Sequence, residues 1–230
     1  MVDLEEIRKI EDALQQPSDR VHVNKFKLNL TTLDFSSLCG INWLTDNIIN
    51  FYMELICERN RQKLAFNDTN YRKVTSMNVF FYGKLRSHGY DGVKTWTRKK
   101  NLFDYDMVLI PIHESQHWTL ATIDMKNKCI CYYDSLHGMK SHYLTILHDY
   151  LKRESSAKGI KDIQWQLQYV TNSPQQTNGS DCGVFTCITA EHLTRKASLS
   201  FSQEDMPYYR RRMLLQTLLY QIWIVDQSSL

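Results

Sequence analysis

The hydrophobic and polar positions along the chain predict helices towards both ends and a block of strands between them. A short amphipathic helix is predicted before Pro17, because the apolar residues there recur at helical spacing. These residues are Leu4, Ile7 and Leu14. Residues 21–35 alternate only partly between apolar and polar side chains, which predicts an extended segment that crosses the surface.

A longer helix is predicted next, with Thr45 or Asn42 as its cap and its end near Arg59. Its expected buried face consists of Ile48, Ile49, Tyr52, Leu55 and Ile56. Residues 60–75 are polar and show no period, so they predict an exposed loop. Helical spacing returns over residues 77–85, with an aromatic face formed by Phe80, Phe81 and Leu85.

The middle of the chain changes to the short apolar and alternating runs that are typical of strands. Residues 107–112, 117–124 and 128–135 predict three consecutive strands, the last two joined by a turn at Lys126 and Asn127. Residues 163–170 predict one more strand.

Helical spacing dominates the rest of the chain. Ser141 is a candidate cap for a helix with Leu144, Leu147 and Leu151 on one side. The last sixty residues predict further helices, whose apolar positions are Val184, Phe185, Ile188, Leu193, Met213, Leu214, Leu218 and Ile222. Helices that flank a central block of strands predict an α+β domain.

Composition agrees with one globular domain over residues 1–230, with a lead-in over about 1–20. Hydrophobic residues make up 43% of the chain, which is enough for a core, and no repeat or linker interrupts it. The net charge of +3 is too small for nucleic-acid binding driven by phosphate neutralisation. No stretch approaches the ~18 apolar residues that a membrane span needs.

Six cysteines raise the question of compartment. The first twenty residues are charged throughout and lack the apolar segment of a signal peptide, so we expect reduced thiols in the cytosol or nucleus. Cys39, Cys57 and Cys187 lie in or beside apolar runs and are expected to be packing residues. Cys129 and Cys131 resemble half of a metal site, but no second pair follows, so packing is expected for them too.

Residues 113–117 read His-Glu-Ser-Gln-His, the pattern of zinc metalloproteases. That pattern works only on a helix, where His113 and His117 would share a face. The flanking residues predict strands instead, and on a strand the two histidines lie ~13 Å apart, too far to share one zinc ion. The sequence also offers no third ligand at a recognisable spacing. A zinc site is therefore disfavoured.

His117 has a second possible partner, Asp134, which follows 17 residues later. Two antiparallel strands joined by a tight turn place the start of the first beside the end of the second. The carboxylate is then positioned to orient the imidazole and stabilise its charged form. The alternative is a structural one: a buried histidine with satisfied hydrogen bonds, and an aspartate that caps its own turn.

Cys182 is the residue that favours catalysis. Polar residues and glycine lead directly into it, and an apolar helix follows, so its thiol is expected near a helix N-terminus. The positive end of the helix dipole stabilises a thiolate there, and a histidine in reach would strengthen the effect. Backbone N–H groups at 180–182, together with the amide of Gln176, are candidates for an oxyanion hole.

Several segments resemble the catalytic domain of the SUMO-specific (sentrin-specific) cysteine proteases, the ubiquitin-like-specific protease family. The resemblance covers nearly the whole chain. It is most specific in INWLTDNIINFY (41–52), FDYDMVLIPIHESQHWTLATID (103–124), CYYDS (131–135), QQTNGSDCGVF (175–185) and MPYYRRRM (206–213). It implies a papain-like α+β architecture, with a central mixed or antiparallel sheet flanked by helices.

The same resemblance implies roles for individual residues. His117 matches the general base, Asp134 its orienting acid, Cys182 the nucleophile and Gln176 the oxyanion donor. The matches to the residues that bind the substrate are Trp43 and Trp118, which would close a tunnel around Gly-Gly, and Asp46 and His113, which would contact the modifier.

The implied reaction is hydrolysis after the C-terminal Gly-Gly of SUMO, in deconjugation from lysines and in precursor maturation. SUMO and SUMO-conjugated proteins are the implied partners, and no cofactor or metal is required. The resemblance also suggests a monomer in the nucleus, including its envelope and pores, or in the cytoplasm. A protease for another ubiquitin-like modifier and an inactive SUMO-binding module remain alternatives. The basic runs 98–100 and 210–212 are expected to be solvated, although the first is a candidate contact for the modifier.

Overall fold

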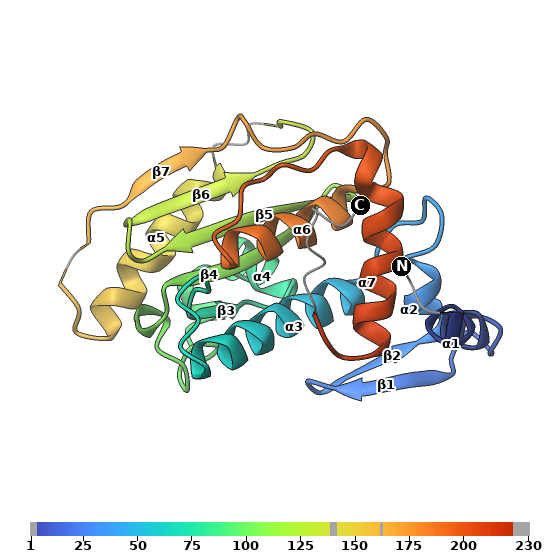
Figure 1. Ribbon diagram of the computed structural model, residues 1–230. Helices are drawn as coiled ribbons and strands as arrows, with labels where there is room; N and C mark the ends of the chain where they lie inside the picture. The colour runs from blue at the N-terminus through green and yellow to red at the C-terminus, as the bar shows by residue number, and fades with distance from the viewer. Residues whose placement is uncertain (1–3, 139–141, 162, 223–230) are drawn as a thin grey trace.

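The computed structural model describes residues 4–138, 142–161 and 163–222, and their central feature is a five-stranded sheet between two layers of helices (Figure 1). Its strands follow the order β3-β4-β5-β6-β7. They span Val74–Ser76 (β3), Met107–Glu114 (β4), His117–Asp124 (β5), Cys129–Tyr133 (β6) and Gln166–Tyr169 (β7). A separate hairpin consists of β1 (Val21–Lys25) and β2 (Leu28–Thr31).

The sheet is mixed, with antiparallel pairing at its centre and parallel pairing at both edges. β4, β5 and β6 form an antiparallel meander, whereas β3 runs parallel to β4 and β7 parallel to β6. The turn between β5 and β6 is fixed by Asp124, whose carboxylate accepts hydrogen bonds from the backbone and side-chain nitrogens of Asn127, each at 2.9 Å. The predicted strands and this turn are therefore confirmed.

Helices cover both faces of the sheet (Figure 1). The helices are α1 (Leu4–Leu14), α2 (Thr32–Ser36), α3 (Asp46–Ala65), α4 (Phe80–His88), α5 (His142–Ala157), α6 (Cys182–Thr194) and α7 (Met206–Leu218). The described residues also form three short 3-10 helices, η1 (Tyr90–Gly92), η2 (Leu102–Asp104) and η3 (Gln203–Asp205). Among the described helices, none is long and apolar enough to cross a membrane.

Two hydrophobic cores lie on the two faces of the sheet, because alternate residues of each strand point to opposite sides. On β5, Leu120 belongs to the core beneath α3, α6 and α7, and Ala121 belongs to the core beneath α4 and α5. The prediction of an α+β fold with helices around a central mixed sheet is thus confirmed.

The expectation of one extended segment over residues 21–35 is wrong. The chain turns back at Phe26 and Lys27, whose φ angles of 56° and 62° suit a two-residue hairpin turn, and it then enters α2. Turns of this kind usually contain Asn or Gly, since both central residues need a positive φ. A Phe-Lys pair gives no such signal in the sequence.

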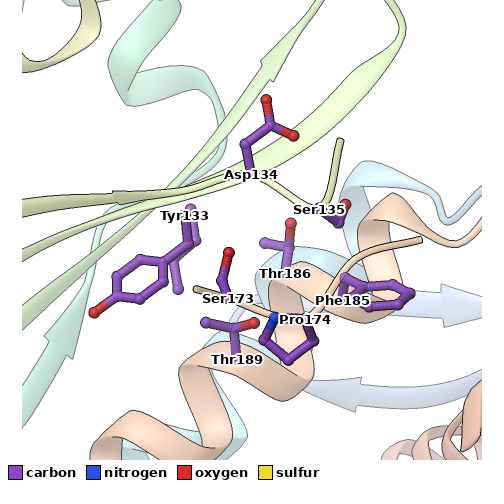
Figure 2. Close-up of a pocket in the computed structure, with 9 residues that line it drawn as sticks. Tyr133, Asp134, Ser135, Ser173, Pro174, Phe185, Thr186 and Thr189 are labelled. Carbon is purple, nitrogen blue, oxygen red and sulfur yellow. The ribbon is translucent and has the colours of Figure 1, made fainter. Parts of the chain in front are cut away.

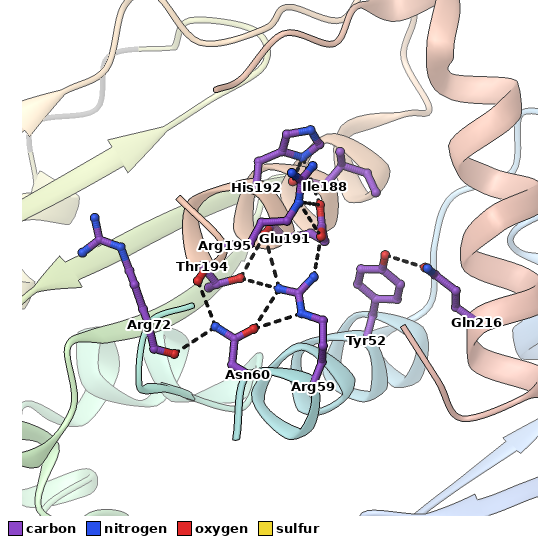
Figure 3. A network of polar contacts seen from close by, with 10 residues as sticks. All are labelled: Tyr52, Arg59, Asn60, Arg72, Ile188, Glu191, His192, Thr194, Arg195 and Gln216. Carbon is purple, nitrogen blue, oxygen red and sulfur yellow. Dashed lines mark hydrogen bonds and ion pairs between the residues drawn. The ribbon is translucent and has the colours of Figure 1, made fainter. Parts of the chain in front are cut away.

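The exposed loop predicted for residues 60–75 is wrong at both ends, because α3 continues to Ala65 and β3 begins at Val74, whereas residues 66–73 between them do form a mostly exposed loop. The apolar periodicity of α3 ends near Arg59 because the buried side chains there, Arg59 and Asn60, are polar. Arg59 forms a buried ion pair with Glu191 of α6, and the Asn60 amide donates to the carbonyl of Thr194 at 2.9 Å (Figure 3). A buried polar network replaces apolar contacts at this end of α3.

The remaining helix predictions are largely confirmed. α1 covers the predicted N-terminal helix, and the predicted helix around residues 144–151 is α5, although its proposed cap Ser141 lies outside the described residues. In α4, Phe81 is buried as expected, but Phe80 is 59% exposed. α6 and α7 account for the predicted C-terminal helices.

Candidate active site

The candidate site begins at the turn between β4 and β5. Ser115 and Gln116 both have positive φ angles, 53° and 62°, and form a two-residue turn that places His117 at the start of β5. His113 lies on β4, so the His-Glu-Ser-Gln-His segment is a hairpin and not the helix that a shared zinc ion requires. The described residues contain no cluster of three or more potential His, Cys, Asp or Glu metal ligands.

His117 and Asp134 are neighbours. His117 Nε2 lies 2.6 Å from Asp134 Oδ1, because Asp134 directly follows β6, the strand that pairs with β5. The Asp134 carboxylate also accepts the backbone N–H groups of Leu136 (2.9 Å) and Gly138 (3.0 Å). The predicted proximity is confirmed, and the turn-capping alternative is also correct, since one carboxylate serves both the imidazole and the turn.

These contacts shift the pKa values of both groups. Burial alone would lower the pKa of His117, but its hydrogen bonds to Asp134 and Cys182 raise that pKa to about 9. Burial alone would raise the pKa of Asp134. The hydrogen bonds from His117 and the turn amides have the larger effect, so the pKa of Asp134 lies below its usual value. A charged imidazolium beside a carboxylate is therefore the favoured state near neutral pH.

Cys182 is the first residue of α6, and its side chain is buried, with 3% exposed. Its thiol is the second side-chain hydrogen-bond partner of His117. The loop before it is shaped by Asn178, whose side-chain oxygen accepts the N–H groups of Ser180 and Asp181, both at 3.1 Å. A thiol at a helix N-terminus beside an imidazolium is the arrangement that stabilises a thiolate nucleophile.

Gln176 is buried and connects the two loops of the site. Its side-chain oxygen accepts a hydrogen bond from Ser135, the residue after Asp134, at 2.6 Å. Its amide nitrogen donates to the carbonyl of Asn178 at 2.6 Å. A primary amide carries two N–H groups, so Gln176 has one more hydrogen to offer.

The two tryptophans differ in exposure. Trp118 is buried on β5 and stacks against His113 across the strand pair, with ring centroids 4.3 Å apart and an angle of 21° between the rings. Trp43 is 51% exposed in the segment before α3. Within the described part of the chain, no ring contact joins Trp43 to Trp118. Asp46 begins α3, three residues after Trp43, and is partly buried.

The Trp43 segment is nevertheless held against the Cys182 loop. Gly183 packs so tightly on Leu44 that a Cβ added to the glycine would lie 3.0 Å from the leucine side chain. Because Leu44 follows Trp43 and Gly183 follows Cys182, this contact brings the backbones of the two segments close together.

Comparison with known proteins agrees with this geometry. Residues 42–220 match the Ulp1 protease family, C-terminal catalytic domain. The chain belongs to this family. It is 40% identical over 223 residues to human sentrin-specific protease 2, an alignment that covers 94% of this chain and 36% of the human protein. It is also 42% identical over 197 residues to a sentrin-specific protease of Caenorhabditis elegans, covering 84% of this chain and 28% of that protein.

A solved structure supports the fold assignment. The C-terminal Ulp1 protease domain, in complex with Smt3, the yeast ortholog of SUMO, matches with a TM-score of 0.82 and 30% identity. The match covers 94% of this chain and 95% of that chain, and it confirms the expected papain-like α+β architecture of the Ulp1 family. The chain spans about a third of the length of the curated relatives that it matches.

The expectation that the basic run 210–212 is solvated is wrong for Arg210 and Arg212, and Arg210 contacts the loop that carries Cys182. Arg210 is 3% exposed and Arg212 is 7% exposed. Arg210 forms a buried ion pair with Asp181 at 2.7 Å and donates to the carbonyls of Asn42 (2.8 Å) and Ser180 (3.1 Å). The sequence held a signal for it, because Arg210 lies one helical turn from Met206 and Met213, which are both buried.

A small cavity of about 10 Å³ lies behind Asp134, between β6 and α6 (Figure 2). The Asp134 carboxylate points away from it, and hydroxyl groups of Ser173, Thr186 and Thr189 contribute to its lining. The volume and polarity suit one buried water molecule.

Proposed function

We propose that this chain is a SUMO-specific cysteine protease that hydrolyses the bond after the C-terminal Gly-Gly of SUMO, in conjugates with target lysines and in SUMO precursors. The observation that carries the proposal is the position of His117, hydrogen-bonded to Asp134 on one side and to Cys182 on the other. The thiol lies at the N-terminus of α6, where an anion is stabilised.

The reaction starts with a proton transfer within the site. The Cys182 thiol gives its proton to His117, through Nδ1, since Nε2 is engaged by Asp134. The thiolate then adds to the carbonyl carbon of the last glycine of the modifier. The remaining N–H of Gln176 and backbone N–H groups at the start of α6 stabilise the negative oxygen of the tetrahedral intermediate.

Two further steps complete the turnover. The C–N bond breaks, and His117 gives its proton to the leaving amine, which is a lysine side chain in a conjugate or a peptide amine in a precursor. His117 then takes a proton from water, and the resulting hydroxide hydrolyses the thioester and frees Cys182. Each step uses groups of the protein, the substrate and water, so no metal or cofactor is needed.

Substrate selection is assigned to the two tryptophans and to two polar residues. Trp43 lies on the segment that packs against the Cys182 loop, and Trp118 follows His117 on β5. Their indoles can therefore enclose a dipeptide without side chains and exclude bulkier residues. His113, exposed on the face of Trp118, and Asp46, at the start of α3, are assigned to contacts with the body of the modifier.

SUMO is proposed as the modifier because the similar human and nematode proteins are named sentrin-specific, and the matching solved structure holds an ortholog of SUMO. The alternatives are a protease for another ubiquitin-like modifier and a SUMO-binding module without turnover. We further assign residues 1–230 to a single catalytic domain, a monomer that does not bind nucleic acid. Because its nucleophile must stay reduced, we place it in the nucleus, including its envelope and pores, or in the cytoplasm.

Fluorogenic cleavage assays with SUMO and with competing modifiers, run in parallel, test the proposal. Wild-type protein is expected to cleave SUMO preferentially and to be labelled at Cys182 by SUMO vinyl sulfone, whereas Cys182→Ser removes both signals. Cys187→Ser is the matched control, since Cys187 is a buried thiol of the same helix with no place in the mechanism. Preference for another modifier, or tight SUMO binding without turnover, would refute the assignment. Chelator-sensitive activity that survives Cys182→Ser would instead favour the zinc mechanism.

A further inference from the structure

A groove of about 680 Å³ lies between the C-terminal half of α3 and the edge strand β3. We call it the basic groove. Its walls come from α3, from β3, and from the segments around Lys100 and Tyr105 that precede β4. Figure 1 shows this end of α3 beside β3, at the margin of the sheet.

Positive charge dominates the basic groove. Its lining holds three cationic side chains, Arg61, Lys73 and Lys100, and one carboxylate, Glu54. Arg61 is exposed and has no side-chain hydrogen bond or ion pair with any described residue. Glu54 interacts electrostatically with Lys100 and Arg61, so one carboxylate offsets part of the charge of the three cations. The excess of positive charge that remains attracts an anionic ligand.

The other two cations are placed by their neighbours. The Lys73 ammonium lies over the ring of Tyr105, 5.4 Å from its centroid, and Lys100 donates to the Thr75 hydroxyl at 2.6 Å. Neither contact neutralises a charge, because both partners are uncharged groups. With Glu54 as the one lining carboxylate, the cations outnumber the anions three to one, and the groove keeps positive charge for a ligand that enters it.

The floor of the basic groove is apolar. Leu64 of α3 and Val74 of β3 contribute to it, with the buried thiol of Cys57 beside them. Ala65, the last residue of α3, adds to this apolar lining. A ligand that fits the basic groove must therefore offer both negative charge and apolar surface.

The basic groove lies far from the candidate active site. Val74 pairs with Met107, at the beginning of β4, whereas Glu114 and the His117 turn lie at its end, about 23 Å away along a strand that rises about 3.3 Å per residue. On α3, Arg61 lies about 22 Å from Asp46 at about 1.5 Å per residue. A ligand in the groove and a substrate at Cys182 can therefore bind at the same time.

We propose that the basic groove binds an acidic peptide segment of a partner protein. Carboxylates of the segment pair with Arg61, Lys73 and Lys100, and an apolar side chain between them packs on Leu64 and Val74. A nucleic acid fits less well, because the aliphatic floor offers no stacking surface and the one lining aromatic ring, Tyr105, is already covered by Lys73.

Fluorescence anisotropy with the full chain tests this. The probe is a fluorescein-labelled peptide of about twelve residues that alternates Asp or Glu with Leu or Val, compared with the same peptide carrying Asn and Gln in place of the acids. The variant is Arg61→Glu with Lys73→Glu. Its control is Lys84→Glu with Lys152→Glu, an equal charge change at exposed positions on α4 and α5.

The acidic peptide is expected to bind wild type and control equally and to bind the groove variant about tenfold or more weakly. Its affinity should fall with added salt, and the neutral peptide should not bind. Unchanged unfolding midpoints and unchanged SUMO cleavage in the groove variant would separate this result from misfolding or loss of the site. No binding to wild type, equal binding to the groove variant, or tighter binding of a single-stranded RNA of similar length would overturn the proposal.

Discussion

Arg210 and Asp181 form an ion pair in which both side chains are 4% exposed, directly beneath the loop that carries Cys182. The same guanidinium donates to carbonyl groups before Trp43 and before Asp181. One buried cation therefore joins α7, the Trp43 segment and the nucleophile loop. Its planar set of donors serves all three at once, which a lysine ammonium does not reproduce.

Replacement of Arg210 should therefore destabilise the protein even when the charge is kept. Arg210→Met leaves the buried Asp181 carboxylate without its cationic partner, with only the neutral donors Asn178 and Gln203, and is expected to lower the free energy of unfolding by about 3 kcal/mol. Arg210→Lys should cost about 2 kcal/mol, through lost hydrogen bonds to charged groups. Urea denaturation measures both, with the exposed neighbour Arg211→Met as a control expected within about 0.5 kcal/mol of wild type. Equal stability of the Lys variant and wild type would contradict the argument.

The same pair predicts a dependence on acid pH. Burial works to raise the pKa of Asp181, but hydrogen bonds from Gln203, Asn178 and Arg210 hold that pKa below its usual value. A lowered folded-state pKa gives stability that is present above the unfolded value of about 3.9 and is lost as the pH falls through the folded one. The stability difference between wild type and Asp181→Asn should therefore shrink between about pH 5 and pH 2. A difference that stays constant over that range would refute it.

Gly138 is expected to control the position of Asp134. A Cβ added to Gly138 would lie 2.8 Å from Asp134 Oδ2, which accepts the Gly138 N–H, so an alanine must displace the carboxylate that binds His117. We expect Gly138→Ala to lower kcat/KM for SUMO cleavage by up to about 10²-fold, as displacements near 1 Å do. Gly83→Ala is the control, since no atom lies within 4 Å of its added Cβ. Full activity of the Gly138 variant would show that the turn adapts without cost.

Much of the fold follows from regular periods in the sequence, and the wrong predictions at residues 21–35 and 60–75 have separate physical causes. The meander of β4, β5 and β6 was predictable because alternate residues serve two separate cores. The end of α3 was not predictable, because a run of polar residues usually indicates a solvent-exposed segment. Here Arg59 is buried and donates hydrogen bonds to Asn60 and Glu191 instead. The Phe26-Lys27 turn lacked the usual turn residues.

The candidate site likewise contains residues that could be predicted from the sequence and residues that could not. His117, Asp134 and Cys182 were identified from strand pairing, from the position before a helix and from family motifs. Arg210 was missed because a basic triplet is usually solvated, and its role depends on three segments that only the fold brings together. Residues that act through side chains at regular spacings were predictable, whereas residues that bind distant backbone carbonyls were not.

The pKa of His117 predicts the alkaline limit of activity. Burial works to lower this pKa, and hydrogen bonds to Asp134 and Cys182 raise it to about 9. Because the thiolate–imidazolium pair needs a protonated His117, kcat/KM should fall as the pH rises through about 9. The raised pKa also stabilises the fold. This stability is fully present below about pH 6.5 and is lost as the pH rises through about 9. Asp134→Asn should shift the alkaline fall of kcat/KM to lower pH. An unshifted fall would show that Asp134 does not raise the pKa that controls activity.

The two tryptophans should respond differently to truncation. Trp118 is buried in the core beneath α3 and α6, so Trp118→Ala is expected to lower the free energy of unfolding by about 3–5 kcal/mol. Trp43 is half exposed, so Trp43→Ala should cost far less stability, about 1 kcal/mol, while lowering kcat/KM for SUMO. Urea denaturation and SUMO cleavage, measured on both variants, test the contrast. Trp96→Ala is a control, because Trp96 is similarly exposed and lies on another segment. If Trp43→Ala cleaved SUMO as fast as Trp96→Ala, the exposed indole would have no part in substrate binding.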